Sequence, residues 1–209
     1  MSEYVDFGFE NAGGSHSHTY LSKPLWKLLG DDKKQIILDL GCGNGSLTRL
    51  LLQEGYNVYG TDASQKGIEI ARNFYPDRFA VQNLESDDLP RELREIKFNT
   101  IISTEVIEHL YNPRKFIRFA KSILVKNGGG DLIISTPYHG YLKNIVIGIS
   151  GKWDTHMNPL WDGGHIKMWS RKTLTRLLEE EGFQVTDFKG CGRLPYLWKS
   201  MIIKGRISL

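Results

Sequence analysis

The most constraining feature of this sequence is a short apolar run that ends in a glycine cluster. Residues 36–40 read Ile-Ile-Leu-Asp-Leu, and three glycines alternate with other residues over positions 41–45. A continuous run of branched apolar residues is typical of a parallel strand buried on both faces, and clustered glycines allow a tight turn into a helix. A helical pattern over residues 46–54 and a second strand pattern over residues 57–62 follow. The chain therefore contains a β-α-β unit, which predicts an α/β fold with a parallel sheet.

Two carboxylates frame this glycine turn. Asp39 lies in the first strand, two residues before Gly41, and Asp62 ends the second strand. Asp39 would repel a pyrophosphate but attract the ammonium of an amino-acid group. Asp62 is placed to accept hydrogen bonds from both hydroxyls of a ribose. The glycine spacing G-x-G-x-G also differs from the G-x-G-x-x-G of dinucleotide-binding folds. The pattern favours an adenosine that carries an amino-acid tail and a sulfonium.

The same residues resemble a known family. The run from Leu38 to Gly45, Leu-Asp-Leu-Gly-Cys-Gly-Asn-Gly, resembles the first motif of class I S-adenosylmethionine-dependent methyltransferases, and Gly60-Thr-Asp-Ala-Ser resembles the second. The run over residues 104–110, Thr-Glu-Val-Ile-Glu-His-Leu, is similar to the E-V-x-E-H run of the ubiquinone-pathway O-methyltransferase group. The resemblance begins at residue 36, is sharp up to His109 and is looser beyond it.

This resemblance implies a fold, a cofactor and a reaction. The fold is a Rossmann-like methyltransferase fold, with a seven-stranded mixed sheet, an antiparallel last strand and helices on both faces. The cofactor is S-adenosyl-L-methionine, and the reaction is methyl transfer to a small-molecule acceptor, with oxygen favoured over nitrogen or carbon. The implied cofactor-binding residues are Asp39, Gly41, Gly43, Asn44, Gly45, Asp62, Ala63, Asn83, Leu84, Ser103 and Thr104.

Asn83 departs from the pattern, because many relatives have an aspartate there. The carbonyl oxygen of an asparagine side chain can still accept a hydrogen bond from the exocyclic amine of adenine. Leu84 would then pack on the ring. The alternative is a turn residue followed by a core leucine.

A long connection follows the fifth predicted strand. Residues 138–169 contain several histidines and tryptophans and an apolar turn over residues 145–149, and connections of this length tend to be lids or substrate loops. Residues 164–170 resemble the H-x-x-x-aromatic-S/T segment that precedes the next helix in many relatives. His165 is therefore the first candidate for an acid-base residue, followed by His109 and His139. For His109, a structural role that orients the loop at the strand tip is favoured over proton acceptance, because a Glu-His pair at a helix start can satisfy its own amides.

No metal site is expected from the sequence. The histidines show no i, i+3 or i, i+4 ligand pair of the kind that helical zinc sites use. The aromatic residues of the connection could hold a ring or an apolar chain of the acceptor, and a satellite core beneath the connection is the equal alternative for each of them.

Length, charge and cysteine content set further bounds. The 209 residues suit one methyltransferase domain, with residues 1–35 as an N-terminal segment and cap helix. Residues 1–19 have no periodic apolar pattern and are expected to form a mobile end. A net charge of +3 without a basic stripe predicts no nucleic-acid partner, and two cysteines without a framework favour the cytoplasm. No signal peptide or membrane-spanning run is recognisable, and the oligomeric state is open.

Two other classes of function stay open at this stage. One is a nicotinamide-dependent oxidoreductase, against which the glycine spacing and Asp39 argue. The other is a non-catalytic partner subunit with a methyltransferase-like fold. If the apolar residues over 141–149 form an exposed ridge, a peripheral membrane contact or a lipidic acceptor is also expected.

Overall fold

The computed structural model describes residues 8–84, 88–161 and 163–208. A seven-stranded sheet forms its centre, in the order β3-β2-β1-β4-β5-β7-β6. The strands are β1 (Ile36–Leu40), β2 (Asn57–Asp62), β3 (Phe79–Val81), β4 (Thr100–Thr104), β5 (Gly129–Pro137), β6 (Gln184–Cys191) and β7 (Ser200–Ser208). Strand β7 runs antiparallel to both of its neighbours. The mixed sheet with an antiparallel last strand is therefore confirmed.

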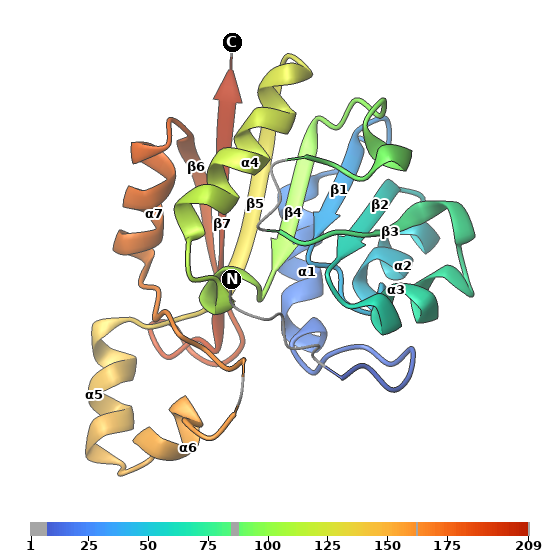
Figure 1. Cartoon of the computed structure of the whole chain (residues 1–209). Helices are drawn as coiled ribbons and strands as arrows, with labels where there is room; N and C mark the ends of the chain where they lie inside the picture. The colour runs from blue at the N-terminus through green and yellow to red at the C-terminus, as the bar shows by residue number, and fades with distance from the viewer. Residues whose placement is uncertain (1–7, 85–87, 162, 209) are drawn as a thin grey trace.

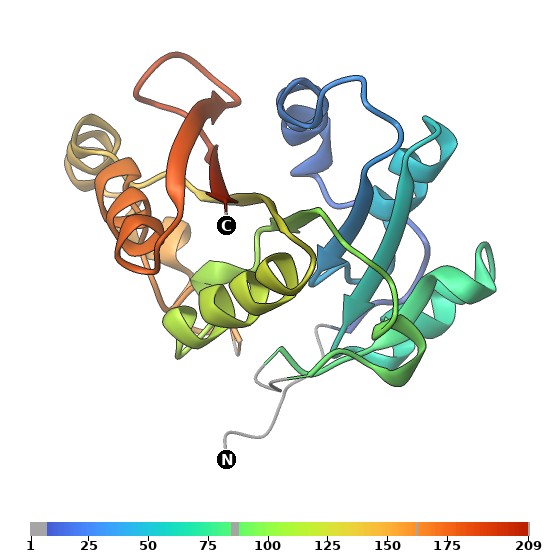
Figure 2. The same ribbon diagram turned by 90° about the horizontal axis from the view of Figure 1, so that it is seen from above.

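Helices cover both faces of this sheet (Figures 1 and 2). They are α1 (His18–Leu29), α2 (Ser46–Gln53), α3 (Gln65–Arg72), α4 (Pro113–Lys126), α5 (Tyr141–Ile149), α6 (Trp153–Met157) and α7 (Arg171–Glu180), with short 3-10 turns η1 (Pro76–Arg78), η2 (Arg91–Leu93) and η3 (Ile107–His109). Figure 2 shows α1 and α4 on opposite faces of the sheet. Among the described residues, every helix is too short or too polar to cross a bilayer.

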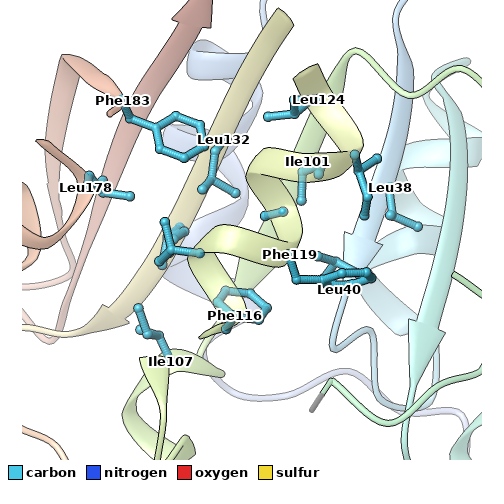
Figure 3. Close-up of a cluster of buried hydrophobic side chains, with 14 of the residues drawn as sticks. Leu38, Leu40, Ile101, Ile107, Phe116, Phe119, Leu124, Leu132, Leu178 and Phe183 are labelled. Atoms are coloured by element: carbon cyan, nitrogen blue, oxygen red, sulfur yellow. The ribbon is translucent and has the colours of Figure 1, made fainter. Parts of the chain in front are cut away.

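The core has two halves because side chains alternate along each strand. Leu38 and Leu40 of β1 belong to the half that packs under α4 and α7, where Phe116 and Phe183 are also buried (Figure 3). Ile37 points to the other half, which contains buried leucines of α1 and α2. Both faces of β1 are therefore buried, as its largely apolar sequence predicts.

Asp39 shares the sheet face of Ile37 and is the exception in this strand. It is 0% exposed, although an unpaired charge in such a position is costly. Strand β1 pairs in parallel with β2 and β4, so the carboxyl ends of these three strands lie at one edge of the sheet. Open parallel sheets bind their ligands at that edge.

Serine side chains cap the N-termini of α3 and α7. Ser64 caps α3 by accepting a 2.9 Å hydrogen bond from the Gly67 amide, and Ser170 forms a capping box with Thr173 at the start of α7. These caps satisfy backbone amides that have no partner inside the helix.

The structure corrects the expected form of residues 138–169. The run over residues 145–149, expected as an apolar turn, belongs to helix α5, and α6 follows it. Figure 1 shows both helices beyond the carboxyl ends of the parallel strands, away from the sheet. Helix α5 buries Lys143 and Ile147 and leaves most of its apolar side chains exposed.

Candidate active site

The glycine turn after β1 depends on backbone that only glycine adopts easily. Gly41, Gly43 and Gly45 have φ values of 84°, 56° and 71°. A Cβ on Gly41 would lie 2.4 Å from Val106 Cγ2, and a Cβ on Gly43 would lie 2.6 Å from the ring of Phe9. The turn therefore packs too closely against its neighbours for any side chain.

Asp62 holds this turn against the end of β2. Its Oδ2 accepts a 2.8 Å hydrogen bond from the Gly43 amide, and its Oδ1 accepts one of 2.8 Å from the Ser64 amide. Each carboxylate oxygen has a second lone pair, so Asp62 can also accept from ribose hydroxyls. Ala63 lies in the chain between Asp62 and Ser64, the cap of α3, and its cofactor contact stays a prediction.

Asp39 provides the second acidic group. Its Oδ2 accepts a 2.6 Å hydrogen bond from Thr48 Oγ1, whereas its Oδ1 has no hydrogen-bond partner among the described residues. Burial raises the pKa of Asp39 to about 7, the Thr48 hydrogen bond opposes this rise, and the charge of Asp62 adds to it. An ammonium group would satisfy the free oxygen and restore the charged form. The residues present therefore fit a ligand with a cationic amino-acid end.

An N-terminal strap, defined here as residues 8–17, lies over the glycine turn. Asn44 Nδ2 donates 2.8 Å hydrogen bonds to the carbonyls of Asn11 and Gly13, and the guanidinium of Arg49 donates to the carbonyl of Ala12. The Phe9 ring reaches Gly43 from the same side. Backbone carbonyls rather than apolar side chains hold residues 11–13 against the glycine turn. The expected mobility of the N-terminal end stays a prediction, and residues 1–7 lie outside the described residues.

The remaining predicted cofactor residues lie at the neighbouring strand ends. Asn83 is exposed just after β3, and Leu84 is half-buried against the core. Ser103 is fully buried and its Oγ donates a 2.7 Å hydrogen bond to the carbonyl of Leu40, while Thr104 ends β4 half-buried. Ser103 therefore ties β4 to β1, and the cofactor contacts of these four residues stay predictions.

Two of the three candidate histidines lie together beyond β4. The ring centroids of His109 and His165 are 5.0 Å apart, and Trp161 packs edge-on against both rings. His109 Nδ1 lies 2.7 Å from the carbonyl oxygen of Gly163 and 3.1 Å from that of Gly164. His109 therefore links the β4 tip to the segment before α7. Burial and the charges of His109, His156 and Lys143 lower the pKa of His165 to about 4.

His139 belongs to a separate group just after β5. It is buried, its amide donates a 2.9 Å hydrogen bond to the Trp169 carbonyl, and its ring centroid lies 5.4 Å from that of His156. Burial lowers the pKa of His139 to about 4, and the nearby Lys143 adds to the effect. The imidazole is therefore neutral near pH 7 and able to accept a proton.

The sequence reasoning missed an acidic network at the same edge. Glu105 has a left-handed φ of 55°, and its carboxylate accepts hydrogen bonds of 2.8 Å from Ser135 Oγ and 3.1 Å from Ser200 Oγ. Burial raises the pKa of Glu105 to about 7, which the two serine hydrogen bonds and the charge of Lys143 oppose. The signal was available in the E-V-x-E-H run, which places a second glutamate three residues before Glu108.

Glu108 is fully buried beside this network. Its Oε2 accepts a 3.0 Å hydrogen bond from Thr136 Oγ1, and its backbone carbonyl accepts from the amides of Ile166 and Lys167. Burial raises the pKa of Glu108, and the charge of Glu105 raises it further. Glu108, His109 and His165 thus form one cluster, although they do not share a helix.

Comparison with known families decides the class of protein. The methyltransferase domain family matches residues 14–187, which include the glycine turn, both framing aspartates and the three candidate histidines. The chain belongs to this methyltransferase family.

The methyltransferase has curated relatives that share most of its length. It is 29% identical over 179 residues to a ubiquinone biosynthesis O-methyltransferase of Ruegeria sp., covering 83% of this chain and 70% of that protein. It is 24% identical over 159 residues to the protein of the same name from Coxiella burnetii, covering 76% of this chain and 67% of the other.

Solved structures confirm the fold of the methyltransferase. The magnesium protoporphyrin IX methyltransferase of Synechocystis, solved with bound SAH, matches with a TM-score of 0.66 at 22% identity, covering 92% of this chain and 84% of that one. An S-adenosylmethionine-dependent methyltransferase from Mesorhizobium loti matches with a TM-score of 0.65 at 18% identity, covering 88% and 96%. The methyltransferase uses S-adenosylmethionine, whose ammonium and ribose suit Asp39 and Asp62.

Proposed function

We propose that this methyltransferase transfers a methyl group to a hydroxyl oxygen of a small molecule. Both curated relatives described above are named as O-methyltransferases. The observation that carries the proposal is the contact between His109 and His165 beyond β4, with His139 within electrostatic range of His165 just after β5. Strand β4 is the direct neighbour of β1, which bears Asp39, so an acceptor near these histidines would lie next to the cofactor.

The protein's own contribution is mainly alignment. S-adenosylmethionine supplies a methyl group already activated by a sulfonium, so holding an acceptor oxygen in line with it accounts for several kcal/mol of the barrier. The Ser103 hydrogen bond to Leu40 and the Glu105 bonds to Ser135 and Ser200 fix the strand ends around that position. We propose His165 as the first candidate to take the hydroxyl proton, with His109 and His139 as the alternatives.

Residues 138–169 are proposed as the lid over the acceptor, within a single domain of residues 1–209. The lid is attached to the domain on two sides, since His109 contacts the carbonyls of Gly163 and Gly164 and Lys143 Nζ donates to the Lys199 carbonyl. Such a lid excludes water from the reacting groups.

The outer face of this lid supports a peripheral membrane contact. Tyr141 is 84% exposed and Ile149 is 85% exposed, and Leu142, Ile145 and Val146 of the same helix also face solvent. A large exposed apolar patch marks a binding surface in most proteins. We propose that α5 rests on a membrane surface and that the acceptor is lipidic, entering from that surface under the lid.

The proposed compartment is the cytoplasm. Cys42 and Cys191 are both buried free thiols in the described residues, which suits a reducing compartment. Immunofluorescence or fractionation of the untagged chain in its own cells would test this.

The test of the function is an acceptor screen with S-adenosylmethionine labelled at the methyl group. Phenols with a long apolar tail, short phenols, carboxylates and amines are compared, with the product identified by mass spectrometry. Transfer to a phenolic oxygen, fastest for the tailed phenol, is expected. Transfer to amines alone would overturn the oxygen assignment. Binding of S-adenosylmethionine without transfer to any acceptor would favour a non-catalytic partner subunit.

A further inference from the structure

A buried lysine without an ion pair lies where the lid meets the domain. Lys143 of α5 is 5% exposed, and its Nζ donates a 3.2 Å hydrogen bond to the carbonyl of Lys199. In the part of the chain that the structure describes, no carboxylate lies within ion-pair distance of this ammonium group. Buried lysines are almost always paired, because an uncompensated charge is costly away from water. Lys143 therefore offers a positive charge that an anionic ligand would neutralise.

The carboxyl group of Glu105 does not fully compensate this charge. It lies within electrostatic range of Lys143, but its oxygens accept their hydrogen bonds from Ser135 and Ser200. Burial raises the pKa of Glu105 to about 7, so the group is only partly ionised near neutral pH. Net positive charge therefore remains beside Lys143.

A second cation reaches the same place from the connection between β6 and β7. Figure 1 shows this connection at the same end of the sheet as α5 and α6. Arg193 of the connection is exposed and has a left-handed φ of 59°, a strained conformation that is frequent at ligand sites. Burial lowers the pKa of Lys143 to about 8, and the charge of Arg193 contributes to this shift. The two cations are thus close enough to repel each other, and an anion bound between them would relieve that repulsion.

Two imidazoles lie beside these cations. The ring centroids of His139 and His156 are 5.4 Å apart. Burial lowers the pKa of His156, and the charges of Lys143 and Arg193 lower it further. His156 is therefore neutral near neutral pH, and its ring keeps one N–H as a hydrogen-bond donor. The group combines two positive charges with a neutral donor, which is a composition suited to an anion with several oxygen atoms.

We propose that Lys143, Arg193 and His156 form an anion subsite for the methyl acceptor, and that the anion is a phosphate monoester of that acceptor. Two cations match the charge of about −2 that a phosphate monoester carries near neutral pH, whereas a carboxylate carries a single charge. Arginine and lysine are also the side chains that most often bind phosphate oxygens. The acceptor is then a hydroxyl compound that also bears a phosphate group.

The place of the anion subsite suits the proposed function, on which its role rests. The Lys199 carbonyl that holds Lys143 directly precedes Ser200, and Ser200 Oγ donates to Glu105 just after β4. Strand β4 is the neighbour of β1, which bears Asp39. An acceptor whose phosphate lies at Lys143 would therefore extend its hydroxyl toward the cofactor edge of the sheet. The subsite selects and orients the acceptor and takes no part in proton transfer.

The direct test compares two ligands that share one phenol ring. The first is para-hydroxyphenyl phosphate, and the second is hydroquinone, in which a neutral hydroxyl replaces the phosphate. Calorimetry uses the full chain saturated with the demethylated product of S-adenosylmethionine. The affinity for the phosphate should be higher by at least about 100-fold, because two hydrogen bonds between charged groups are gained. The same pair is then offered as acceptors with labelled S-adenosylmethionine, and the ratio of the KM values should follow the ratio of the affinities.

Two substitutions in the subsite and one control in the same lid assign this preference. Arg193→Gln removes an exposed cation, and Lys143→Met removes the buried charge but keeps an unbranched side chain. Each should reduce the preference for the phosphate by about 10-fold and leave the affinity for hydroquinone unchanged. Lys152→Gln removes an exposed lysine of the lid and should keep the full preference. Arg193→Gln tests the subsite even if Lys143→Met fails to fold.

Three results would overturn the proposal in whole or in part. Equal affinity of the wild type for the two ligands would remove the subsite. A phosphate preference that is the same in Arg193→Gln and Lys152→Gln would remove Arg193 from it. Tighter binding of para-hydroxybenzoate than of para-hydroxyphenyl phosphate would overturn the choice of phosphate.

The anion subsite and the proposed function can fail separately. Binding of para-hydroxyphenyl phosphate that depends on Arg193, without methyl transfer to any hydroxyl, would retain the subsite and remove the proposed function. Methyl transfer to hydroquinone and to its phosphate with the same KM would retain the proposed function and remove the subsite.

Discussion

The amide of Gly43 donates a 2.8 Å hydrogen bond to Asp62 Oδ2, so a single carboxylate both shapes the glycine turn and faces the expected ribose. Asp62→Ala removes both contributions. Two charge-assisted hydrogen bonds at about 1.5 kcal/mol or more each correspond to a loss of about 100-fold or more in affinity for S-adenosylmethionine. Calorimetry with S-adenosylmethionine and its demethylated product measures this loss. Asp77→Ala, which removes an exposed aspartate in η1, is the control, and unchanged affinity in Asp62→Ala would contradict the ribose assignment.

Asp39 predicts an unusual pH dependence of stability in the absence of cofactor. Its folded pKa is raised from 3.8 to about 7, so the folded state binds this proton more tightly than the unfolded state does. The resulting stabilisation is complete below about pH 4 and is lost as pH rises to about 7. Between about pH 5 and pH 8 the wild type should lose on the order of 2–3 kcal/mol relative to Asp39→Asn. Urea denaturation of both proteins at the two pH values measures the difference, and parallel pH profiles would show that Asp39 is not the titrating group.

Gly41 predicts a steric conflict that a second substitution can relieve. In Gly41→Ala the new Cβ would lie 2.4 Å from Val106 Cγ2 at a φ of 84°, so a loss of about 2–4 kcal/mol in the free energy of unfolding is expected. Val106→Ala should recover part of this loss in the double variant, because it removes the clashing methyl groups. Gly148→Ala in α5, where a Cβ meets no atom within 4 Å, should be neutral or stabilising by up to about 1 kcal/mol. Purely additive effects of Gly41→Ala and Val106→Ala would rule out the clash.

The exposed face of α5 predicts binding to lipid vesicles. Ile149→Glu places a negative charge on a side chain that is 85% exposed. Flotation with anionic vesicles should decrease by about 10-fold or more, because the substitution removes apolar area that the membrane would bury and adds a charge that anionic lipids repel. Leu50→Glu, on the exposed side of α2, should float as the wild type does. If neither the wild type nor the variants float, the lipidic acceptor loses its support, while the methyltransferase assignment is unaffected.

The β-α-β unit was predictable because its determinants are local. The apolar run of β1, the glycines after it and Asp62 at the end of β2 lie within one short stretch, and each one restricts the backbone or the ligand directly. The caps at Ser64 and Ser170 were predictable for the same reason. The antiparallel last strand was an expectation of the family resemblance, and the pairing of β6 with β7 confirms it.

Helix α5 was not predictable from its pattern, because most of its apolar side chains face solvent, whereas a lysine side chain is buried. It buries the charged Lys143, whose Nζ donates to the Lys199 carbonyl, and exposes the apolar Val146 and Ile149. A pattern rule that places apolar side chains inward cannot find such a helix. The contact between His109 and His165 was equally hidden, since it depends on how the lid folds back over β4.

The strap lies over the glycine turn, where the cofactor is proposed to bind, whereas the proposed lid lies beyond β4 and β5. Three strap carbonyls are bonded to Asn44 and Arg49 beside the glycine turn, whereas the lid is fastened to His109 beyond β4. Spent donor and methylated product would therefore depart through separate gates, each with its own opening rate. The slower gate sets the turnover number whenever the chemical step is fast, and a substitution in one gate leaves the residence time of the other substrate unchanged.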